Sequence, residues 1–444
     1  MKKIFVFTWF LIFTNFVFAQ SHSLVGYWQN WNDSQCPYIP INQVDTNYNV
    51  IAVAFAIPLA GTTYNMQFTP DGISQNTFIQ QINSVKATGK KVIISIGGQN
   101  HPISLNNTSE RDVFVNTMIQ IINTYNFDGL DIDIEGQFNI TGGTIANPVD
   151  SRIINMINAV KTMMTQFRNT HNKKMFLSMA PETANLTGGM SGYGGIWGSY
   201  LPLIYALKDS IDIIQMQLYN SGSMYGIDGR IYFQGTTDFI CSQTEAVIRG
   251  FNTAGGMFPG LRADQVAVGL PACSSAAGGG YIIPDSVKAA IKYLRGMGPK
   301  PSTYTTQGTY NSLRGMMTWS VNWDNMTNCH PRYAFANNYA SIFNLSSVSI
   351  TSESETPENF ILHQNYPNPF NPETKIVFSL NETGNVKLNI YDISGKLISQ
   401  LRNEILSPGS YFNNFNAGNF SSGVYICELE FNGLKKSNFM TLLK

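Results

Sequence analysis

The chain of 444 residues carries 28 basic and 28 acidic residues, so its formal net charge is zero and only 13% of its residues are charged. That balance excludes the excess of basic residues that binding of nucleic acid or of a charged membrane surface would need. The length exceeds one ordinary domain and suits one large domain followed by a small one. Aromatic residues reach 12%, which suits large cores and also stacking on flat, weakly charged ligands such as sugars.

The N-terminus has the pattern of an export signal. Two lysines precede an apolar run from Ile4 to Phe18, and Ala19 offers a small residue for cleavage. The run is short for a membrane span, and no second apolar run of that kind follows it. We therefore predict a signal peptide over residues 1–19 and an exported mature chain without a membrane span.

The cysteines and histidines indicate neither a metal site nor a disulfide scaffold. Both residue types number five, the cysteines show no metal-ligand spacing, and the histidines form no cluster. We expect buried free thiols with room for one bridge, and no metal or cofactor. The cysteines are Cys36, Cys241, Cys273, Cys329 and Cys427, and the pairing among the first four stays open.

From Leu24 to Phe343, short apolar runs alternate with longer amphipathic ones. Most short runs are continuously apolar, as expected for parallel strands that are covered on both faces. The longer segments carry apolar residues at helical spacing, such as Phe78, Ile82 and Val85. Eight strands with intervening helices predict an α/β fold, a (β/α)8 TIM barrel, in which function gathers at the C-terminal strand ends. The predicted strands are Val25–Trp28, Val50–Ala56, Lys91–Gly97, Gly129–Glu135, Met175–Ala180, Ile211–Tyr219, Val266–Leu270 and Gly315–Val321.

The fourth predicted strand, Gly129–Glu135, is acidic at every second position. Because side chains alternate between the faces of a strand, Asp131, Asp133 and Glu135 share one face, about 6.6–6.8 Å apart. Carboxylates this close repel one another, so at least one should keep its proton near neutral pH. A general acid requires such a proton, and Glu135 ends the strand where a barrel places catalysis. A polar layer inside the barrel and a site for a hard cation are the alternatives.

The composition changes after the predicted barrel. Residues 346–358 are rich in Ser, Thr, Glu and Pro, which indicates a linker. Residues 359–444 hold short alternating runs separated by turn sequences, which predict a small all-β sandwich. This part contains no cluster of acidic, His or Cys residues that could do chemistry. The runs are Lys375–Leu380, Val386–Tyr391, Lys396–Leu401, Gly409–Asn413, Gly423–Phe431 and Lys436–Leu443.

The acidic stretch Asp128–Glu135 resembles the DGxDxDxE signature of glycoside hydrolase family 18, the chitinases, at every fixed position. The likeness extends over roughly residues 22–345 and implies a catalytic barrel over residues 20–345. The other stretches that resemble strand motifs of the family are Gly26–Trp31, Ser95–Gly98, Leu177–Glu182, Gln215–Asn220 and Met317–Asp324.

The resemblance implies how the acidic residues would act on a β-1,4-linked polymer of N-acetylglucosamine. Glu135 would protonate the glycosidic oxygen and then activate water as a base. The 2-acetamido oxygen of the sugar would attack C1 and form an oxazolinium ion, with retention of the anomeric configuration. Asp133 would hold the acetamido N–H, Asp131 would tune both carboxyls from beneath, and Tyr219 would donate its hydroxyl to the acetamido oxygen. No metal or cofactor is implied.

Four further residues are expected to bind the substrate. Gln217 shares a strand face with Tyr219 and is a second polar contact. Trp319 would form the floor under the −1 sugar, the unit whose C1 is attacked. Tyr27 and Met179 lie in the stretches that match the first and fifth strands. Tyr and Trp residues near strand ends also commonly fill a barrel, so the alternative for Tyr219 and Trp319 is a purely structural role.

One position departs from the common family pattern. Many members carry Tyr-Asp after the sixth strand, whereas Tyr219 is followed here by Asn220. This form resembles the compact bacterial and plant branch. Only about 45 residues separate Leu270 from Gly315, which leaves little room for the α+β insertion of the deep-cleft branch. We therefore expect a shallow, open groove that cuts inside a chain.

Residues 359–444 resemble the type A sorting domain of the type IX secretion system. Asn365–Pro372, Val386–Asp392 and Gly423–Tyr425 match its motifs. The resemblance implies the type IX machinery as a partner: the signal peptide would direct the chain across the inner membrane, and this domain across the outer membrane to the cell surface or the medium. A sugar-binding accessory module is the alternative.

Three functions compete at this point. The first is an endo-acting chitinase. The second is an endo-β-N-acetylglucosaminidase that cuts the core of N-glycans with the same acid motif, but the stretch Met317–Asp324 favours the first. The third is a chitin-binding lectin without activity; such proteins usually lack the acid, and Glu135 is present.

Overall fold

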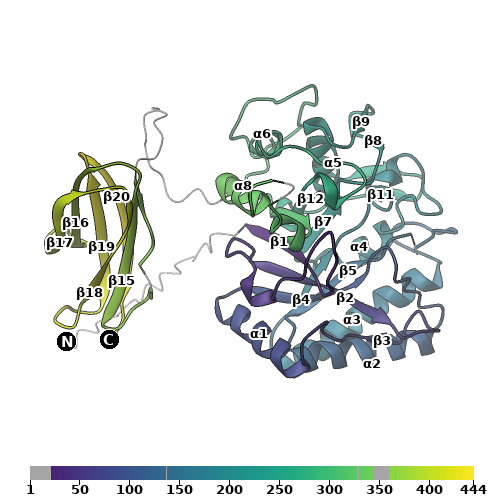
Figure 1. Ribbon diagram of the computed structural model, residues 1–444. Helices are drawn as coiled ribbons and strands as arrows, with labels where there is room; N and C mark the ends of the chain where they lie inside the picture. Colours follow the sequence, from purple (N-terminus) through teal and green to yellow (C-terminus); the bar gives the residue numbers. More distant parts are fainter. Residues whose placement is uncertain (1–21, 137, 328–329, 344–359, 366) are drawn as a thin grey trace, which may run out of the picture. The chain divides into compact units, whose positions relative to one another are not determined.

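The contacts within the chain divide it into two compact units, residues 1–347 and 348–444, each with its own core (Figure 1). The signal peptide predicted over residues 1–19 and the linker predicted over residues 346–358 lie outside the described residues. The computed structural model describes residues 22–136, 138–327, 330–343, 360–365 and 367–444.

Eight parallel strands close into a barrel in the first unit. Their order is β1-β13-β12-β7-β6-β5-β4-β2, and β1 also pairs with β2, which completes the ring. All eight predicted strands are present, and the prediction of a (β/α)8 barrel is confirmed. The bounds are β1 Ser23–Gln29, β2 Val50–Pro58, β4 Lys91–Gly97, β5 Gly129–Asp133, β6 Phe176–Met179, β7 Ile213–Gln217, β12 Val266–Pro271 and β13 Gly315–Trp319.

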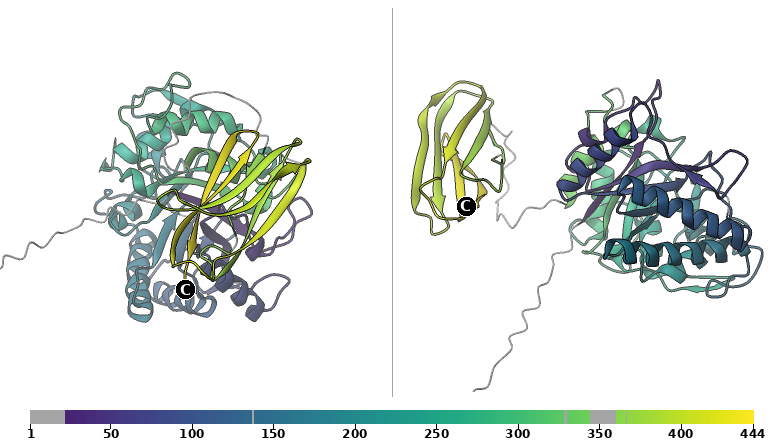
Figure 2. Two further views of the ribbon diagram at one scale, coloured as in Figure 1. Left: turned by 90° about the vertical axis from the view of Figure 1, so that its left-hand side faces the viewer. Right: turned by 90° about the horizontal axis from the view of Figure 1, so that it is seen from below.

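Helices cover the outside of the barrel. The residues that predicted the first helix, Phe78, Ile82 and Val85, are all buried against the strands. Helix α2 packs against both α1 and α3 along one side of the unit (Figure 2). The bounds are α1 Gln75–Ala87, α2 Thr108–Tyr125, α3 Ser151–His171, α4 Leu201–Leu207, α5 Thr237–Arg249, α6 Pro284–Leu294, α7 Val321–Asp324 and α8 Ala334–Phe343.

The connections between these elements are short. Residues 272–314, which join β12 to β13 and are all described, contain α6 and one 3-10 turn but no strand. The α+β insertion of the deep-cleft branch is therefore absent from this connection, as expected. The remaining short elements are β3 Met66–Gln67, β8 Ser223–Tyr225, β9 Ile231–Phe233, β10 Phe251–Thr253, β11 Gly256–Phe258 and the 3-10 turns Ile41–Gln43, Thr187–Met190, Ala263–Gln265 and Ser274–Ala276.

The second unit consists of two antiparallel sheets with the strand orders β14-β15-β18 and β17-β16-β19-β20. Alternate residues of both sheets contribute to one apolar core, so the sheets pack face to face as a sandwich. All six predicted strands are present, and β14 was not predicted. The bounds are β14 Phe360–Leu362, β15 Glu373–Leu380, β16 Gly384–Asp392, β17 Leu397–Leu406, β18 Gly409–Asn416, β19 Gly423–Phe431 and β20 Leu434–Leu442.

Candidate active site

The acidic strand β5 leads to the C-terminal edge of the barrel. At its start, a Cβ on Gly129 would lie 1.9 Å from a carbonyl oxygen of β6, so only glycine lets the two strands approach this closely. The strand ends at Asp133, whereas the sequence predicted Glu135 as its last residue. The reason is that the Ile134 N–H donates to the hydroxyl of Tyr200 at 2.7 Å instead of continuing the strand ladder. Glu135 therefore lies two residues beyond the strand.

Asp131 is completely buried inside the barrel. Burial raises its pKa, although four hydrogen bonds favour its charged form. Four donors fill the accepting capacity of one carboxylate, so Asp131 is held in a single orientation. The donors are Tyr27 Oη at 2.6 Å, Ser95 Oγ at 2.7 Å, Ser178 Oγ at 2.6 Å and Gln215 Nε2 at 3.1 Å.

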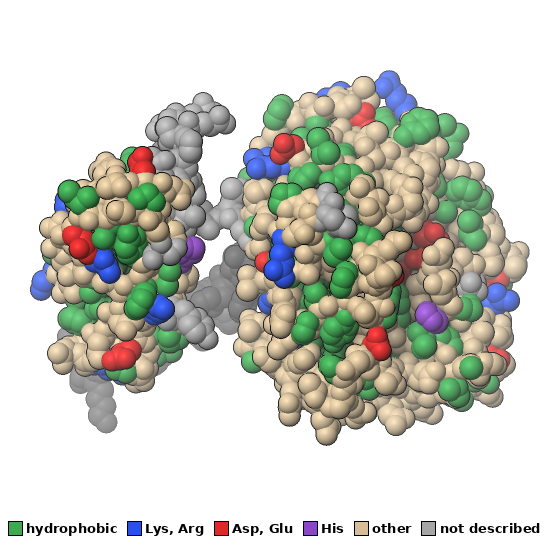
Figure 3. Space-filling view, in the orientation of Figure 1, with side chains coloured by type: hydrophobic (Ala, Val, Ile, Leu, Met, Phe, Trp, Pro, Cys, Tyr) green, Lys and Arg blue, Asp and Glu red, His purple; other side chains and the backbone are tan. Residues whose placement is uncertain are grey.

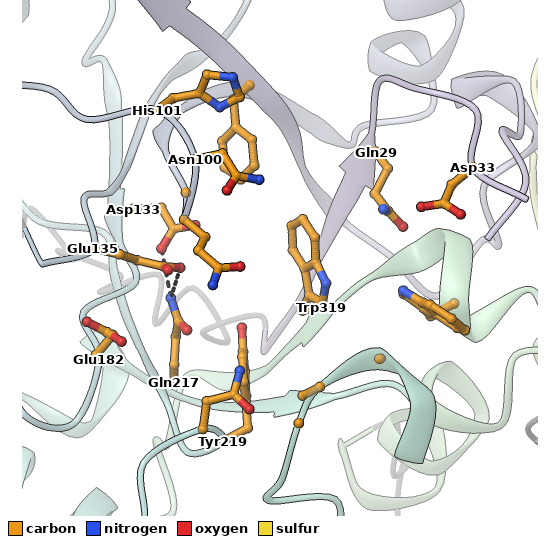
Figure 4. Close-up of a pocket in the computed structure, with 18 of the residues that line it drawn as sticks. Gln29, Asp33, Asn100, His101, Asp133, Glu135, Glu182, Gln217, Tyr219 and Trp319 are labelled. Atoms are coloured by element: carbon orange, nitrogen blue, oxygen red, sulfur yellow. Dashed lines mark hydrogen bonds between the residues drawn. The ribbon is translucent and has the colours of Figure 1, made fainter. Parts of the chain in front are cut away.

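Asp133 and Glu135 share one amide donor. Gln217 at the end of β7 donates from Nε2 to Asp133 Oδ1 at 2.8 Å and to Glu135 Oε1 at 3.3 Å (Figure 4). The same Nε2 lies 3.1 Å from the Ala180 carbonyl oxygen, which fixes the amide. Two carboxyl groups from β5 and its following loop thus meet beside one neutral donor.

The raised pKa values of these carboxyls have identifiable causes. Burial is the largest cause for Asp133, followed by the charges of Glu135 and Asp131. Burial also raises the pKa of Glu135 against the hydrogen bond from Gln217, and the charge of Glu182 raises it further. The predicted repulsion is therefore present, but the added charge that acts on Glu135 comes from Glu182. These shifts favour a proton on the Asp133–Glu135 pair at a pH where isolated carboxyls are ionised.

The raised pKa of Asp133 predicts a cost in stability. The folded state binds more protons than the unfolded state, so the free energy of unfolding should fall as pH rises from the ordinary carboxyl range through the raised pKa. We expect Asp133→Asn to flatten this slope and to stabilise the protein near neutral pH. Thermal unfolding between acidic and neutral pH measures both effects. Asp285→Asn, at an exposed site on α6, is the control, and equal slopes for all three proteins would contradict the prediction.

These side chains open into a pocket of about 780 Å³ at the C-terminal ends of the strands. Figure 3 shows acidic side chains recessed in a hollow of the first unit's surface. Its lining residues are Gln29, Trp31, Asp33, Phe55, Gly98, Gln99, Asn100, His101, Asp133, Glu135, Glu182, Gln217, Tyr219, Asn220, Ser275, Ala276, Ala277, Gly278, Trp319 and Trp323.

An aromatic wall stands beside the carboxyls. Trp319 at the end of β13 packs nearly parallel to Phe55, with ring centroids 6.0 Å apart and an interplanar angle of 14°. Trp31 lies 6.2 Å from Trp319 and 6.3 Å from Phe55. Because these rings fix one another, the indole of Trp319 presents a rigid, half-buried face to the pocket, suited to the apolar face of a pyranose ring.

Tyr219 and Asn220 close the β7 side of the pocket. Burial and the charge of Asp133 raise the pKa of Tyr219 well above its usual value, so its hydroxyl keeps its proton and remains a donor. Asn220 has a left-handed φ of 53°, which Asn tolerates better than most residues. Its Oδ1 accepts from the Gly279 N–H at 3.1 Å. Asn220 thereby ties the β7 end to the loop after β12.

Two predicted substrate contacts do not reach the pocket. Tyr27 is 1% exposed and donates to Asp131, so it supports that carboxylate from inside the barrel. Met179 is fully buried in the core between barrel and helices, because Ser178 before it faces the barrel interior. The predictions of Tyr27 and Met179 as substrate contacts are therefore corrected. The structure brings Asp133, Glu135, Gln217, Tyr219 and Trp319 together around the pocket.

Several pocket residues were not predicted as site residues. Glu182 follows β6 and pairs through its backbone with Gln217. Its position in the stretch matching the fifth strand was a usable signal. Asp33, Phe55 and His101 come from the ends or following loops of three other strands, and no pattern in the sequence linked them to the acidic strand.

The described residues contain no group of three or more His, Cys, Asp or Glu side chains that could hold a metal ion. Among them Cys36, Cys241 and Cys427 are free and buried, and Cys273 is disulfide-bonded. Cys329 lies outside the described residues. No helix in the described part of the chain is both long and apolar enough to span a membrane.

A closed barrel with a pair of carboxyls, Asp133 and Glu135, at its C-terminal mouth is typical of glycoside hydrolases. The comparisons with known proteins agree with this class. Residues 23–274 match the family described as glycosyl hydrolases family 18. The chain therefore belongs to glycosyl hydrolases family 18. Residues 364–441 match the family described as secretion system C-terminal sorting domain, which supports export to the medium or the cell surface.

The relatives it resembles include several chitinases. Chitinase D of Niallia circulans is 40% identical over 339 residues, which cover 74% of this chain and 63% of that protein. A probable class II chitinase of Arthroderma benhamiae is 36% identical, over 64% of this chain and 90% of that protein. The chain thus spans less than two thirds of the length of the first of these relatives. A solved family 18 chitinase of Chromobacterium violaceum has a TM-score of 0.66 and 35% identity, over 73% of this chain and 83% of that one.

Proposed function

We propose that the chain is an endo-acting chitinase that hydrolyses β-1,4 linkages between N-acetylglucosamine units with retention of configuration. The observation that carries this proposal is the pairing of Asp133 and Glu135 on one amide of Gln217, beside the half-buried face of Trp319. A carboxyl that keeps its proton lies next to a second carboxyl and an apolar platform for a sugar. The named chitinases among its relatives support the same substrate class.

In the proposed first step, Glu135 donates its proton to the glycosidic oxygen while the acetamido oxygen of the −1 sugar forms a bond to C1. The leaving sugar departs with the proton, and the −1 sugar becomes an oxazolinium ion. Asp133 accepts the acetamido N–H and stabilises the positive charge that develops. Tyr219 donates its hydroxyl to the acetamido oxygen and aligns it, and Trp319 supports the ring from below.

In the second step, Glu135 as a carboxylate removes a proton from water, whose oxygen attacks C1 and reopens the acetamido group. Two displacements on C1 retain its configuration. Asp131, held by its four donors, keeps a fixed negative field beneath Asp133 throughout. The substrate supplies the nucleophile, so the protein needs one acid–base carboxyl rather than two.

We further propose an endo mode of attack, which the short connection between β12 and β13 supports. The connection from β12 to β13 lacks the insertion that would build a high wall. An open groove lets a polymer bind anywhere along its length, whereas a tunnel favours chain ends. We propose that Glu135 cuts at internal linkages.

The competing activities differ in their products. An endo-chitinase should release short N-acetylglucosamine oligomers from chitohexaose and leave a high-mannose glycopeptide intact. An endo-β-N-acetylglucosaminidase would release the glycan from the glycopeptide, and a lectin would bind both sugars without products. Chromatography of both digests separates the three outcomes. Glycan release faster than chitohexaose cleavage, or no product from either, would overturn the proposal.

We further propose the domain boundaries and the route of export. Residues 1–19 act as a signal peptide for the inner membrane, and residues 20–345 form the catalytic barrel. Residues 346–358 link it to residues 359–444, which direct passage across the outer membrane by the type IX machinery. The match of residues 364–441 to a sorting domain supports this route.

A further inference from the structure

The charges in the pocket all have one sign. Its lining includes Asp33, Asp133, Glu135 and Glu182, and none of the described residues that line it is Lys or Arg. Burial lowers the pKa of the one lining histidine, His101, which favours its neutral form. The chain as a whole has no net charge, so this is a local concentration of negative charge that favours cationic over anionic ligands.

Among these acidic residues, Asp33 lies away from the other three. Trp319 lies between Asp133 and Glu135 on one side and Gln29 and Asp33 on the other (Figure 4). If the −1 sugar rests on Trp319 with its bond to the leaving group near Glu135, then its other neighbour extends toward Asp33. That neighbour is the −2 unit, on the non-reducing side of the −1 sugar.

Gln29 offers donors at the same end of the pocket. The residue is 4% exposed, and its Oε1 accepts from Ser320 Oγ at 2.7 Å and from Cys36 Sγ at 3.2 Å. These two contacts orient the amide, and among the described residues no hydrogen bond involves its Nε2. The Gln29 residue is almost fully buried, and its Nε2 has no hydrogen-bond partner among the described residues, so this donor is free for a ligand that carries acceptors.

Asp33 is available as an acceptor beside it. Its Oδ1 accepts the N–H of Gln35 at 2.8 Å, which holds a local turn. Among the described residues Asp33 takes part in no salt bridge, and its side chain is exposed at the rim. A carboxylate so placed binds an ammonium group more strongly than a neutral amide N–H, because the hydrogen bond is then charge-assisted on both sides.

We propose that this pocket prefers partly deacetylated chitin, with glucosamine in the −2 position and its ammonium group paired with Asp33. The inference rests on the proposed function, which requires an N-acetyl group at −1 and places no such demand on −2. Gln29 would donate to a hydroxyl of the same unit. The preference is modest, since an exposed ion pair changes an equilibrium by about two- to fivefold.

The test is the composition of products from partly deacetylated chitin of known acetylation. Sequencing the new reducing ends by mass spectrometry gives the sugar at −1 and the one before it, at −2. We expect glucosamine at −2 to be enriched about two- to fivefold over random cleavage beside an acetylated unit. The enrichment is a ratio within one digest, so a change in overall rate does not affect it.

Two substitutions of Asp33 make the test specific. Asp33→Asn keeps Oδ1 for the turn and should abolish the enrichment, and Asp33→Lys should reverse it to a depletion. Asp285→Asn removes the same charge from α6, outside the pocket, and should leave the enrichment unchanged. Random occupancy of −2 in the wild type, or enrichment that survives Asp33→Asn, would overturn the inference.

The outcomes also separate this inference from the proposed function. Glucosamine at the new reducing ends as often as acetylated sugar would overturn the proposed function itself. Acetylated ends with a random −2 unit would overturn only the role of Asp33. If a variant fails to fold, the wild-type protein alone can test the inference. Salt screens an exposed ion pair, so the enrichment of glucosamine at −2 should shrink at high salt. An enrichment that does not depend on salt would contradict the role of Asp33.

Discussion

Replacing Glu135 by Gln should reduce the turnover of chitohexaose by about 10²–10⁴-fold, the usual contribution of a positioned acid–base group. Gln has nearly the same shape and can still contact Gln217, but it has no proton to give to the glycosidic oxygen. Binding should persist, because the aromatic wall and the other polar groups remain. Turnover assays together with calorimetric titration of chitohexaose measure the two quantities separately.

Glu110→Gln, on α2 outside the pocket, is the matched control and should keep wild-type turnover. Equal melting temperatures would show that the Glu135 variant is folded. Wild-type turnover by a folded Glu135→Gln protein would remove this residue from the role of general acid.

The second large effect concerns Asp133→Asn. Its amide would still fit beside Gln217, but it would carry no charge to stabilise the oxazolinium ion and would accept the acetamido N–H less strongly. We expect kcat to fall by about 10²–10³-fold, as when one stabilising group is removed from a preorganised site. The same variant is expected to gain stability near neutral pH, so loss of activity cannot be attributed to unfolding.

A stabilised Asp133→Asn protein with unchanged kcat would argue against assistance by the substrate. A fall in kcat/KM with unchanged kcat would assign Asp133 to ground-state binding only. The expected result is a lower kcat with a pH profile that also changes, because Asp133 and Glu135 lie against one amide and bind protons as a pair.

The barrel could be predicted from the sequence because its strands are covered on both faces. Runs such as Val50–Ala56 and Lys91–Gly97 are apolar almost throughout, and in a long α/β chain such short runs are typical of buried parallel strands. The acidic face of β5 was visible for a related reason: alternation places Asp131 and Asp133 on one side of any strand. Alternation could not show that the strand ends at Asp133, because the N–H of Ile134 donates to the hydroxyl of Tyr200 instead of to a neighbouring strand.

The loop residues of the pocket could not be predicted from the alternation of apolar and polar residues. Asp33 and His101 follow different strands, and only closure of the ring brings them to one pocket. Met179 was predicted from a matching stretch without regard to its face, and the register of Ser178 opposite Asp131 turns it toward the helices. A motif identified the right strands, but the pairing of those strands decided which side chains face the substrate.

The most direct test of this account compares chitohexaose with the fully deacetylated hexamer of glucosamine. The acidic pocket favours binding of the cationic hexamer, so weak binding would not explain a lack of cleavage. We expect the deacetylated hexamer to bind and to remain intact, because it lacks the acetamido oxygen that attacks C1. Cleavage of both hexamers at similar rates would show that the protein supplies the nucleophile, and it would contradict both assistance by the substrate and the proposed role of Asp133.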